Sequence, residues 1–197
     1  MTEASPRLIT LAGSTRQASV NKKLARLAAA RAQATGASVE YLDLADYPMP
    51  IYDGDLEARD GLPETARSLK ARFRGSDGFL IASPEYNSSL PPVLKNALDW
   101  ISRPETEDEP GLVAYRGKVA ALMAASPSGM GGMRGLVPLR MMLGNIGVHV
   151  VPDQLTMPRA FGAFTANDQL ADPDHDERLA TVVRTWVATA RRLHCSA

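Results

Sequence analysis

The segment 13–23 has the composition of an anion-binding loop. It reads Gly-Ser-Thr-Arg-Gln-Ala-Ser-Val-Asn-Lys-Lys and leads directly into a helical pattern. The N–H groups and dipole of a first helical turn favour a phosphate, to which Ser14 and Ser19 can donate hydrogen bonds and Arg16 a charge-assisted pair. The alternative is that Ser19 or Asn21 only caps the helix. The segment lacks the glycine spacing of nucleotide-hydrolase and dinucleotide-binding loops.

The segment 83–92 combines a planar side chain with a restricted backbone. It reads Ser-Pro-Glu-Tyr-Asn-Ser-Ser-Leu-Pro-Pro. Its prolines hold the main-chain groups between them in fixed directions, which suits a flat heteroaromatic ring. Tyr86 could pack against such a ring while N–H groups of the loop bind its polar edge. An ordinary turn in which Asn87 bonds its own backbone explains these residues equally well.

The segment 126–135 is rich in glycine, with four glycines in seven residues from 129 to 135. Glycine lets a ligand approach the backbone closely, although a flexible turn explains the segment nearly as well. Four of the eight methionines lie between residues 130 and 142. For Met141 and Met142, the helical context favours core packing over a soft interface.

These three segments follow predicted strands. Apolar runs without alternation occur at residues 8–12, 79–82 and 119–125, as is typical of strands buried on both faces of a parallel sheet. Two weaker runs, 39–44 and 148–151, indicate strands nearer the edges. A helical stripe of apolar residues follows each of the five strands, the last one running from Leu179 to Leu193.

This alternation predicts a three-layer α/β sandwich with right-handed crossovers. Five strands in 197 residues favour the flavodoxin-like order 2-1-3-4-5, in a single domain over residues 1–197. In an open parallel sheet, ligands bind outside the carboxyl ends of the strands at the topological switch point. The three segments would therefore meet at one sheet edge and bind one phosphate and one flat ring together.

Composition excludes several classes of partner. The chain has 22 Lys plus Arg against 22 Asp plus Glu, so a nucleic acid is not expected as its partner. No apolar run is long enough for a membrane span and no secretory signal begins the chain, which predicts a cytoplasmic protein with no membrane partner. The single cysteine, Cys195, fits a reducing compartment. The acidic stretch 104–111 reads as a solvated loop, with a lid or partner site as the alternative.

The motifs resemble those of the NADPH-dependent FMN reductase family, which includes bacterial chromate, quinone and azo-dye reductases. The resemblance covers residues 7–160 and rests on G-S-x-R-x-x-S-x-N at 13–21, P-E-Y-N at 84–87, L-K-N-A-L-D-W at 94–100 and the glycine-rich segment. It implies a flavodoxin-like fold that binds FMN, takes hydride from NADPH or NADH, and passes electrons to a quinone, free flavin, azo compound or metal oxyanion. It also implies a homodimer or homotetramer.

The resemblance also implies which residues hold FMN. Its phosphate would lie at the first segment, its ring edge at the second, and a third contact would come from the glycine-rich segment. The residues so implied are Ser14, Arg16, Ser19, Val20, Asn21, Pro84, Glu85, Tyr86, Asn87, Ser126 and Gly129. Arg134 resembles a position near the oligomer interface. The acidic stretch from 105 to 111 departs from the family pattern and bears on the shape of the site entrance.

No catalytic acid or base and no metal site is expected, because the flavin performs the difficult step and His149, His175 and His194 have no evident partners. Two other functions remain open. A non-enzymatic electron carrier of the flavodoxin type would share the fold and the cofactor, although such carriers tend to be strongly acidic. An interaction module without cofactor would use the helix faces around residues 133–142.

Overall fold

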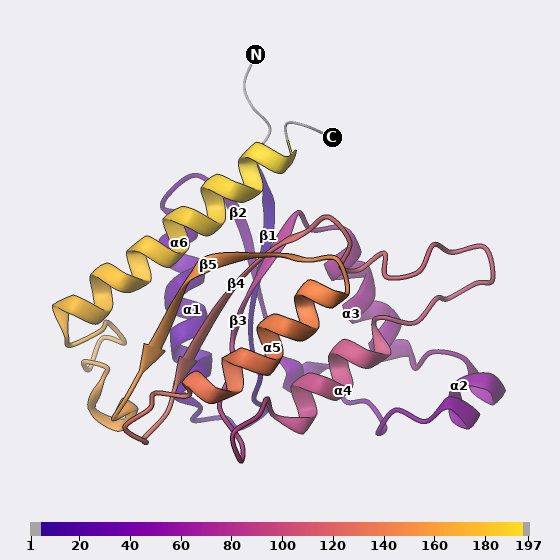
Figure 1. The fold of residues 1–197 in the computed structure, drawn as a ribbon, viewed down its shortest axis with the longest axis horizontal. Coiled ribbons are helices and arrows are strands. Elements are labelled where there is room, and N and C mark those ends of the chain that lie inside the picture. Colours follow the sequence, from indigo (N-terminus) through magenta and orange to yellow (C-terminus); the bar gives the residue numbers. More distant parts are fainter. Residues whose placement is uncertain (1–4, 195–197) are drawn as a thin grey trace.

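Residues 5–194 are described by a computed structural model (Figure 1), and Cys195 lies outside them. Five parallel strands form one sheet in the order β2-β1-β3-β4-β5, which confirms the predicted order 2-1-3-4-5. The strands are β1 (Arg7–Ala12), β2 (Ser38–Leu42), β3 (Gly78–Ala82), β4 (Val119–Ala125) and β5 (His149–Met157).

Helices cover both faces of the sheet and complete the predicted three layers (Figure 1). Helices α1 (Val20–Gln33) and α6 (Pro173–His194) pack on one face. On the other face lie α3 (Glu64–Arg74), α4 (Pro92–Trp100) and α5 (Met133–Asn145). The remaining helices are α2 (Gly54–Asp60) and two 3-10 turns, η1 (Leu44–Asp46) and η2 (Ala160–Gly162).

Strand β3 shows why its sequence is apolar throughout. Phe79 and Ile81 pack under α3, α4 and α5, whereas Leu80 and Ala82 pack under α1 and α6. Successive side chains of a strand point to opposite faces, so a strand with helices on both sides needs apolar residues at every position. All five residues of β3 are buried. The carboxyl end of this strand is thereby held in the middle of the sheet, where it starts one of the candidate loops.

Strand β5 is longer than predicted. The apolar run at 148–151 is followed by Pro152 and Asp153, but the strand continues to Met157. Its pairing with β4 shifts register, since Ala120 pairs with Val150 while Leu122 pairs with Gln154. A bulge on an edge strand leaves room for a proline that cannot donate to the ladder. The added residues carry the chain to the same sheet edge as the three candidate segments.

The segment between β2 and α3 contains α2, which the sequence patterns did not predict because none of its residues is buried. Side chains of α4 hold this segment in place: Asn96 Nδ2 and Trp100 Nε1 both donate to Pro50 O, at 2.8 Å each. Figure 1 shows α2 projecting from the body of the molecule.

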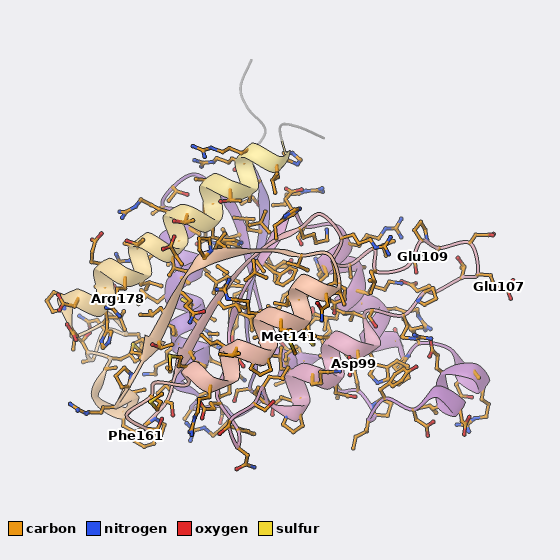
Figure 2. The ribbon with its side chains drawn as sticks, in the orientation of Figure 1. Asp99, Glu107, Glu109, Met141, Phe161 and Arg178 are labelled. Atoms are coloured by element: carbon orange, nitrogen blue, oxygen red, sulfur yellow. The ribbon has the colours of Figure 1, made fainter. Side chains whose placement is uncertain are left out.

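The acidic stretch 104–111 is irregular, as predicted, and is anchored at its base. Lys70, whose side chain is only 1 % exposed, pairs with Glu109 and donates to Arg103 O at 2.7 Å. Figure 2 shows Glu107, at the tip, on the opposite side of the molecule from Phe161 in η2. The stretch therefore follows α4 as a protruding loop, and Lys70 of α3 tethers its base.

The two methionines near the end of α5, Met141 and Met142, were both predicted to pack in the core, but they lie on different sides of the helix. Met142 packs against the core, as predicted, but Met141 is 64 % exposed and the prediction for it was wrong. The helical stripe that enters the core is occupied by Leu136, Leu139 and Leu143, which leaves Met141 on the outer face. Within residues 5–194, no helix has the length and hydropathy needed to cross a membrane.

Candidate functional site

The first candidate loop joins β1 to α1 and places polar groups around the start of the helix. Gly13 N donates to Ala82 O at 2.9 Å, which ties the loop to the neighbouring strand. Ser14 Oγ accepts a bond from Arg16 N at 3.3 Å, so its own O–H remains free to donate outward. Ser19 stands at the N-cap position of α1, yet its hydroxyl makes no capping bond. The capping alternative for Ser19 therefore does not hold.

The first turn of α1 presents backbone donors to this loop. Lys23 N bonds to Ser19 O at 3.3 Å, which begins the helical ladder. The N–H groups of Val20, Asn21 and Lys22 precede that bond and have no partner within the helix. Such a set of donors at the positive end of a helix dipole is a site for an anion.

Asn21 bridges two elements that are far apart in the sequence. Its Nδ2 donates to Ala125 O at 2.8 Å, and its Oδ1 accepts from Ala125 N at 2.9 Å. These two bonds join the start of α1 to the end of β4 and leave the backbone N–H of Asn21 as its group for a ligand. The side chain thus positions the first loop against the third.

Lys22 lies behind the same loop and is almost fully buried. Its ammonium forms an ion pair with Asp43 Oδ1 at 2.7 Å and donates to Thr15 O at 3.2 Å. Asp43 in turn accepts a bond from Ala45 N at 3.0 Å at the start of η1. The ion pair fastens the first loop to the end of β2, and the Thr15 carbonyl of that loop points toward the Lys22 ammonium.

The second candidate loop is a tight turn after β3. Tyr86 and Ser89 exchange two backbone hydrogen bonds of 2.9 and 3.0 Å. The two residues between them, Asn87 and Ser88, have φ values of 50° and 66°. This left-handed pair is the conformation of a type I′ turn, for which asparagine is well suited. The turn projects the ring of Tyr86, which is 52 % exposed.

Glu85 fastens the second loop to the start of α5. Its Oε1 accepts from Arg134 Nε at 2.8 Å and lies 2.6 Å from Arg134 Nη2, while its Oε2 accepts from Arg134 N at 3.1 Å. Gly135 permits this close approach, since a Cβ there would lie 3.0 Å from Ser89 O. Both carboxylate oxygens of Glu85 are therefore occupied by Arg134.

The third candidate loop is shaped by two of its glycines. Gly131 and Gly132 have φ values of +61° and +86°, and a Cβ on Gly132 would lie 2.7 Å from Ala124 Cβ. Ser126 Oγ accepts from Ser128 N at 3.2 Å. Gly129 has open space around it. The loop is accordingly held by packing at residues 131 and 132 rather than being a flexible turn.

These loops enclose one cavity of about 340 Å³ at the carboxyl edge of the sheet. This volume falls within the range of roughly 300–1,000 Å³ that is common for small-molecule sites. Nine of the eleven predicted residues line it, and Asn87 and Gly129 do not. The lining residues are Ser14, Arg16, Ser19, Val20, Asn21, Pro84, Glu85, Tyr86, Ala125, Ser126, Pro127 and Phe161.

Three lining residues were not among those predicted: Ala125 and Pro127, which adjoin the predicted Ser126, and Phe161. Phe161 comes from η2, beyond the end of β5, and is 75 % exposed. The loops after strands one, three and four were predicted to form the site, whereas the loop after strand five was not. The available signal was an aromatic residue soon after a strand that ends at the same sheet edge. None of the residues 104–111 lines this cavity, so the acidic stretch does not shape its entrance.

The three histidines lie away from the cavity. His149 begins β5 at the opposite edge of the sheet. His175 Nδ1 lies 3.1 Å from Asp172 Oδ2, and His194 Nδ1 lies 3.2 Å from Asp77 Oδ1. The ionisable side chains that line the cavity are Arg16, Glu85 and Tyr86, and the carboxylate of Glu85 is already bound by Arg134.

Comparison with known proteins matches residues 6–162 to the profile of the NADPH-dependent FMN reductase family. The chain is 32 % identical over 192 residues to a probable NADPH:quinone oxidoreductase of Oryza sativa subsp. japonica, covering 95 % of this chain and 90 % of the relative. It is 33 % identical over 159 residues to an NAD(P)H-dependent FMN reductase of Pseudomonas aeruginosa, covering 80 % and 81 %.

Among solved structures, the flavoenzyme NAD(P)H:(acceptor) oxidoreductase FerB of Paracoccus denitrificans has the same fold, with a TM-score of 0.80. It is 28 % identical, and the match covers 95 % of this chain and 98 % of that one. The chain belongs to the NADPH-dependent FMN reductase family.

Membership in the FMN reductase family confirms the resemblance drawn from the motifs, together with the predicted enzyme class and cofactors. This FMN reductase is an NAD(P)H-dependent oxidoreductase with FMN as its cofactor. The comparisons give no support to a non-enzymatic electron carrier. The lining of the cavity also fits the group, since it combines anion donors with aromatic side chains.

Proposed function

We propose that this chain reduces quinone-type acceptors with NAD(P)H through FMN held in the cavity at the carboxyl edge of the sheet. The observation that carries the proposal is the convergence of three loops, from β1, β3 and β4, on one cavity with buried anion donors. The names of the relatives from Oryza sativa and Escherichia coli support quinones as acceptors.

We assign the phosphate of FMN to the first loop. Arg16 supplies the charge, the hydroxyls of Ser14 and Ser19 donate, and the N–H groups of Val20 and Asn21 point along the helix axis. One arginine and a helix start can hold a phosphate although the net charge of the chain is zero.

The ring is assigned to the second and third loops. Pro84 and Tyr86 offer flat apolar surface, the backbone of Glu85 offers polar groups to the ring edge, and Ser126 approaches from the third loop. Asn87 contributes through the turn conformation that presents Tyr86, and Gly129 leaves space beside the third loop. Both positions remain predictions as direct contacts.

Bound FMN supplies the redox chemistry, which converts NAD(P)H, a quinone and a proton into NAD(P)⁺ and a hydroquinone. The residues of the chain bind, orient and exclude water. We assign no side chain of the cavity lining the role of acid or base. The carboxylate of Glu85 is bound by Arg134, and the second proton of the hydroquinone can come from water.

We further propose a homodimer or homotetramer that buries the outer face of α5. Met133, Val137 and Met141 lie four residues apart on this helix and are 40, 65 and 64 % exposed. Such a stripe of exposed apolar side chains favours contact with another protein surface. The nearby exposed residues Met130 and Tyr86 extend the apolar area toward the cavity.

The test is to purify the protein, record its visible spectrum and assay NADPH and NADH oxidation with benzoquinone, ferricyanide and free FMN. We expect flavin absorbance, or its appearance on adding FMN, together with quinone-dependent oxidation of NADPH or NADH. A protein that binds FMN but oxidises neither nicotinamide with any acceptor would contradict the reductase function. A protein that takes up no FMN would contradict the site.

A further inference from the structure

The lining of the cavity combines buried and exposed residues. The polar residues Ser14, Ser19 and Asn21 are between 2 and 5 % exposed. The aromatic residues Tyr86 and Phe161 are 52 and 75 % exposed. Tyr86 is assigned to the flavin ring, which leaves Phe161 as an exposed aromatic side chain of the lining that a substrate entering and leaving at each turnover can contact.

The backbone that carries Phe161 is fixed to the site. Ala160, the residue before it, is buried, and its N–H donates to Ser126 O at 3.1 Å. Arg159 has a φ of 51° and its N–H donates to Ser128 O at 3.4 Å. Both acceptors belong to the third loop, which lines the same cavity. The position of Phe161 is therefore set by the site rather than by a free chain segment.

The exposed side chain of Phe161 would be stabilised by a ligand that covers its ring. Burial of a phenylalanine side chain stabilises by roughly 1.5–3 kcal/mol relative to leaving it exposed. Single exposed apolar residues are common on protein surfaces, but this one borders a cavity and is held there by two backbone bonds. The ring offers no polar group, so it suits a flat apolar ligand.

We infer that Phe161 is a specificity-determining residue of the acceptor site, against which the ring of a quinone-type acceptor packs when it lies over the bound flavin. The inference rests on the proposed function and goes beyond it by naming the side chain that selects flat, apolar acceptors. The phosphate and ring edge of the cofactor are assigned to other loops, so we expect loss of the Phe161 ring to leave FMN affinity unchanged. A hydrated anion such as ferricyanide gains nothing from this ring.

The experiment compares Phe161→Ala, Phe161→Tyr and the wild-type protein, each saturated with FMN, in NAD(P)H-dependent reduction of benzoquinone and of ferricyanide. We expect Phe161→Ala to lower kcat/KM for benzoquinone roughly tenfold through KM, and to leave kcat/KM for ferricyanide within about twofold. Phe161→Tyr keeps the ring and restores the benzoquinone value. Ile51→Ala, at an exposed position that does not line the cavity, is the matched control and changes neither value.

FMN affinity, measured by fluorescence titration, and particle mass in solution complete the test. Both stay at wild-type values in Phe161→Ala if the inference is right. Equal losses with both acceptors, a weakened FMN affinity, a changed particle mass, or no change at all in Phe161→Ala would each overturn the inference. The proposed function fails separately, and visibly, if the wild-type protein itself binds no FMN or oxidises no NAD(P)H.

Discussion

At the scale of single residues, Arg16 carries a local charge that the composition of the chain conceals. Its guanidinium is exposed beside the cavity and donates from Nη2 to Ala18 O at 2.9 Å. This bond keeps the side chain close to the loop instead of extended into water. Because the residue contributes nothing to the core, its removal affects an anion more than it affects the fold.

We expect Arg16→Ala to weaken FMN binding by roughly ten- to a hundredfold, the range that follows from losing one charge-assisted hydrogen bond. The affinity for riboflavin, which lacks the phosphate, should change by less than about twofold. Fluorescence titration with both flavins measures the two effects. Arg178→Ala, on the exposed start of α6 and outside the cavity, is the matched control. Equal losses for FMN and riboflavin would remove Arg16 from the phosphate site.

At the scale of elements, the buried pair of Lys22 and Asp43 joins α1 to the end of β2. We expect Lys22→Met to lower the free energy of unfolding by about 3 kcal/mol, because it removes the buried cation paired with Asp43 and leaves only the more exposed Arg26, at 3.8 Å, as its charged neighbour. The double variant Lys22→Met/Asp43→Asn should lose less than the sum of the two single variants. Urea denaturation of all four proteins measures this coupling.

The matched control for this cycle is the exposed pair of Arg59 and Asp60 in α2, whose side chains are 68 and 54 % exposed. Solvent screens such a pair, so Arg59→Met should leave the free energy of unfolding unchanged within the error of the measurement. If Lys22→Met were equally mild, the ion pair would not hold the loop in place.

The tether of the acidic stretch adds a pH dependence to the stability of the fold. Burial of the Glu109 carboxyl raises its pKa, but hydrogen bonds from Lys70 and from the backbone of Glu105, with the charges of Lys70 and Arg74, outweigh this and lower the pKa below its ordinary value of 4.5. A carboxyl whose pKa is lower in the folded state stabilises the fold above its unfolded pKa. That contribution disappears as the pH falls through the lowered value.

We therefore expect Glu109→Gln to lower the free energy of unfolding by roughly 1–3 kcal/mol at neutral pH, the range for a hydrogen bond to a charged group. The difference from the wild-type protein should shrink as the pH falls well below 4.5. Urea denaturation across this pH range tests both statements, with Glu107→Gln at the exposed tip as control. A difference that stayed constant down to acid pH would show that the Glu109 charge is not responsible.

At the scale of the whole molecule, the proposed oligomer depends on the outer face of α5. We expect Val137→Asp to dissociate the oligomer, because it places a charge in an apolar contact and should raise the dissociation constant by roughly a hundredfold or more. Size-exclusion chromatography with light scattering measures the particle mass. Ala188→Asp, exposed on α6, adds the same charge elsewhere and should leave the mass unchanged. A wild-type protein that is already monomeric would contradict the proposed contact.

The order of the strands and the position of the candidate loops were both predictable from the sequence. The apolar runs at residues 79–82 and 119–125 have no alternation, which indicates strands covered on both faces, and the helical stripes between them require parallel crossovers. Once the sheet is parallel, the loops at 13–23, 83–92 and 126–135 must meet at its carboxyl edge. Local periodicity is enough for these conclusions because it depends only on residues close together in the chain.

What each polar group does at that edge depended on the tertiary structure. Asn21 was compatible with a cap or a ligand contact, and its bonds to Ala125, 104 residues away, make it a bridge. Glu85 is occupied by Arg134, and Met141 faces solvent although its helix enters the core. Sequence patterns specify which face of an element is apolar, but the hydrogen-bond partner of a polar side chain comes from a distant segment. Only the packing of the whole chain brings that segment within reach.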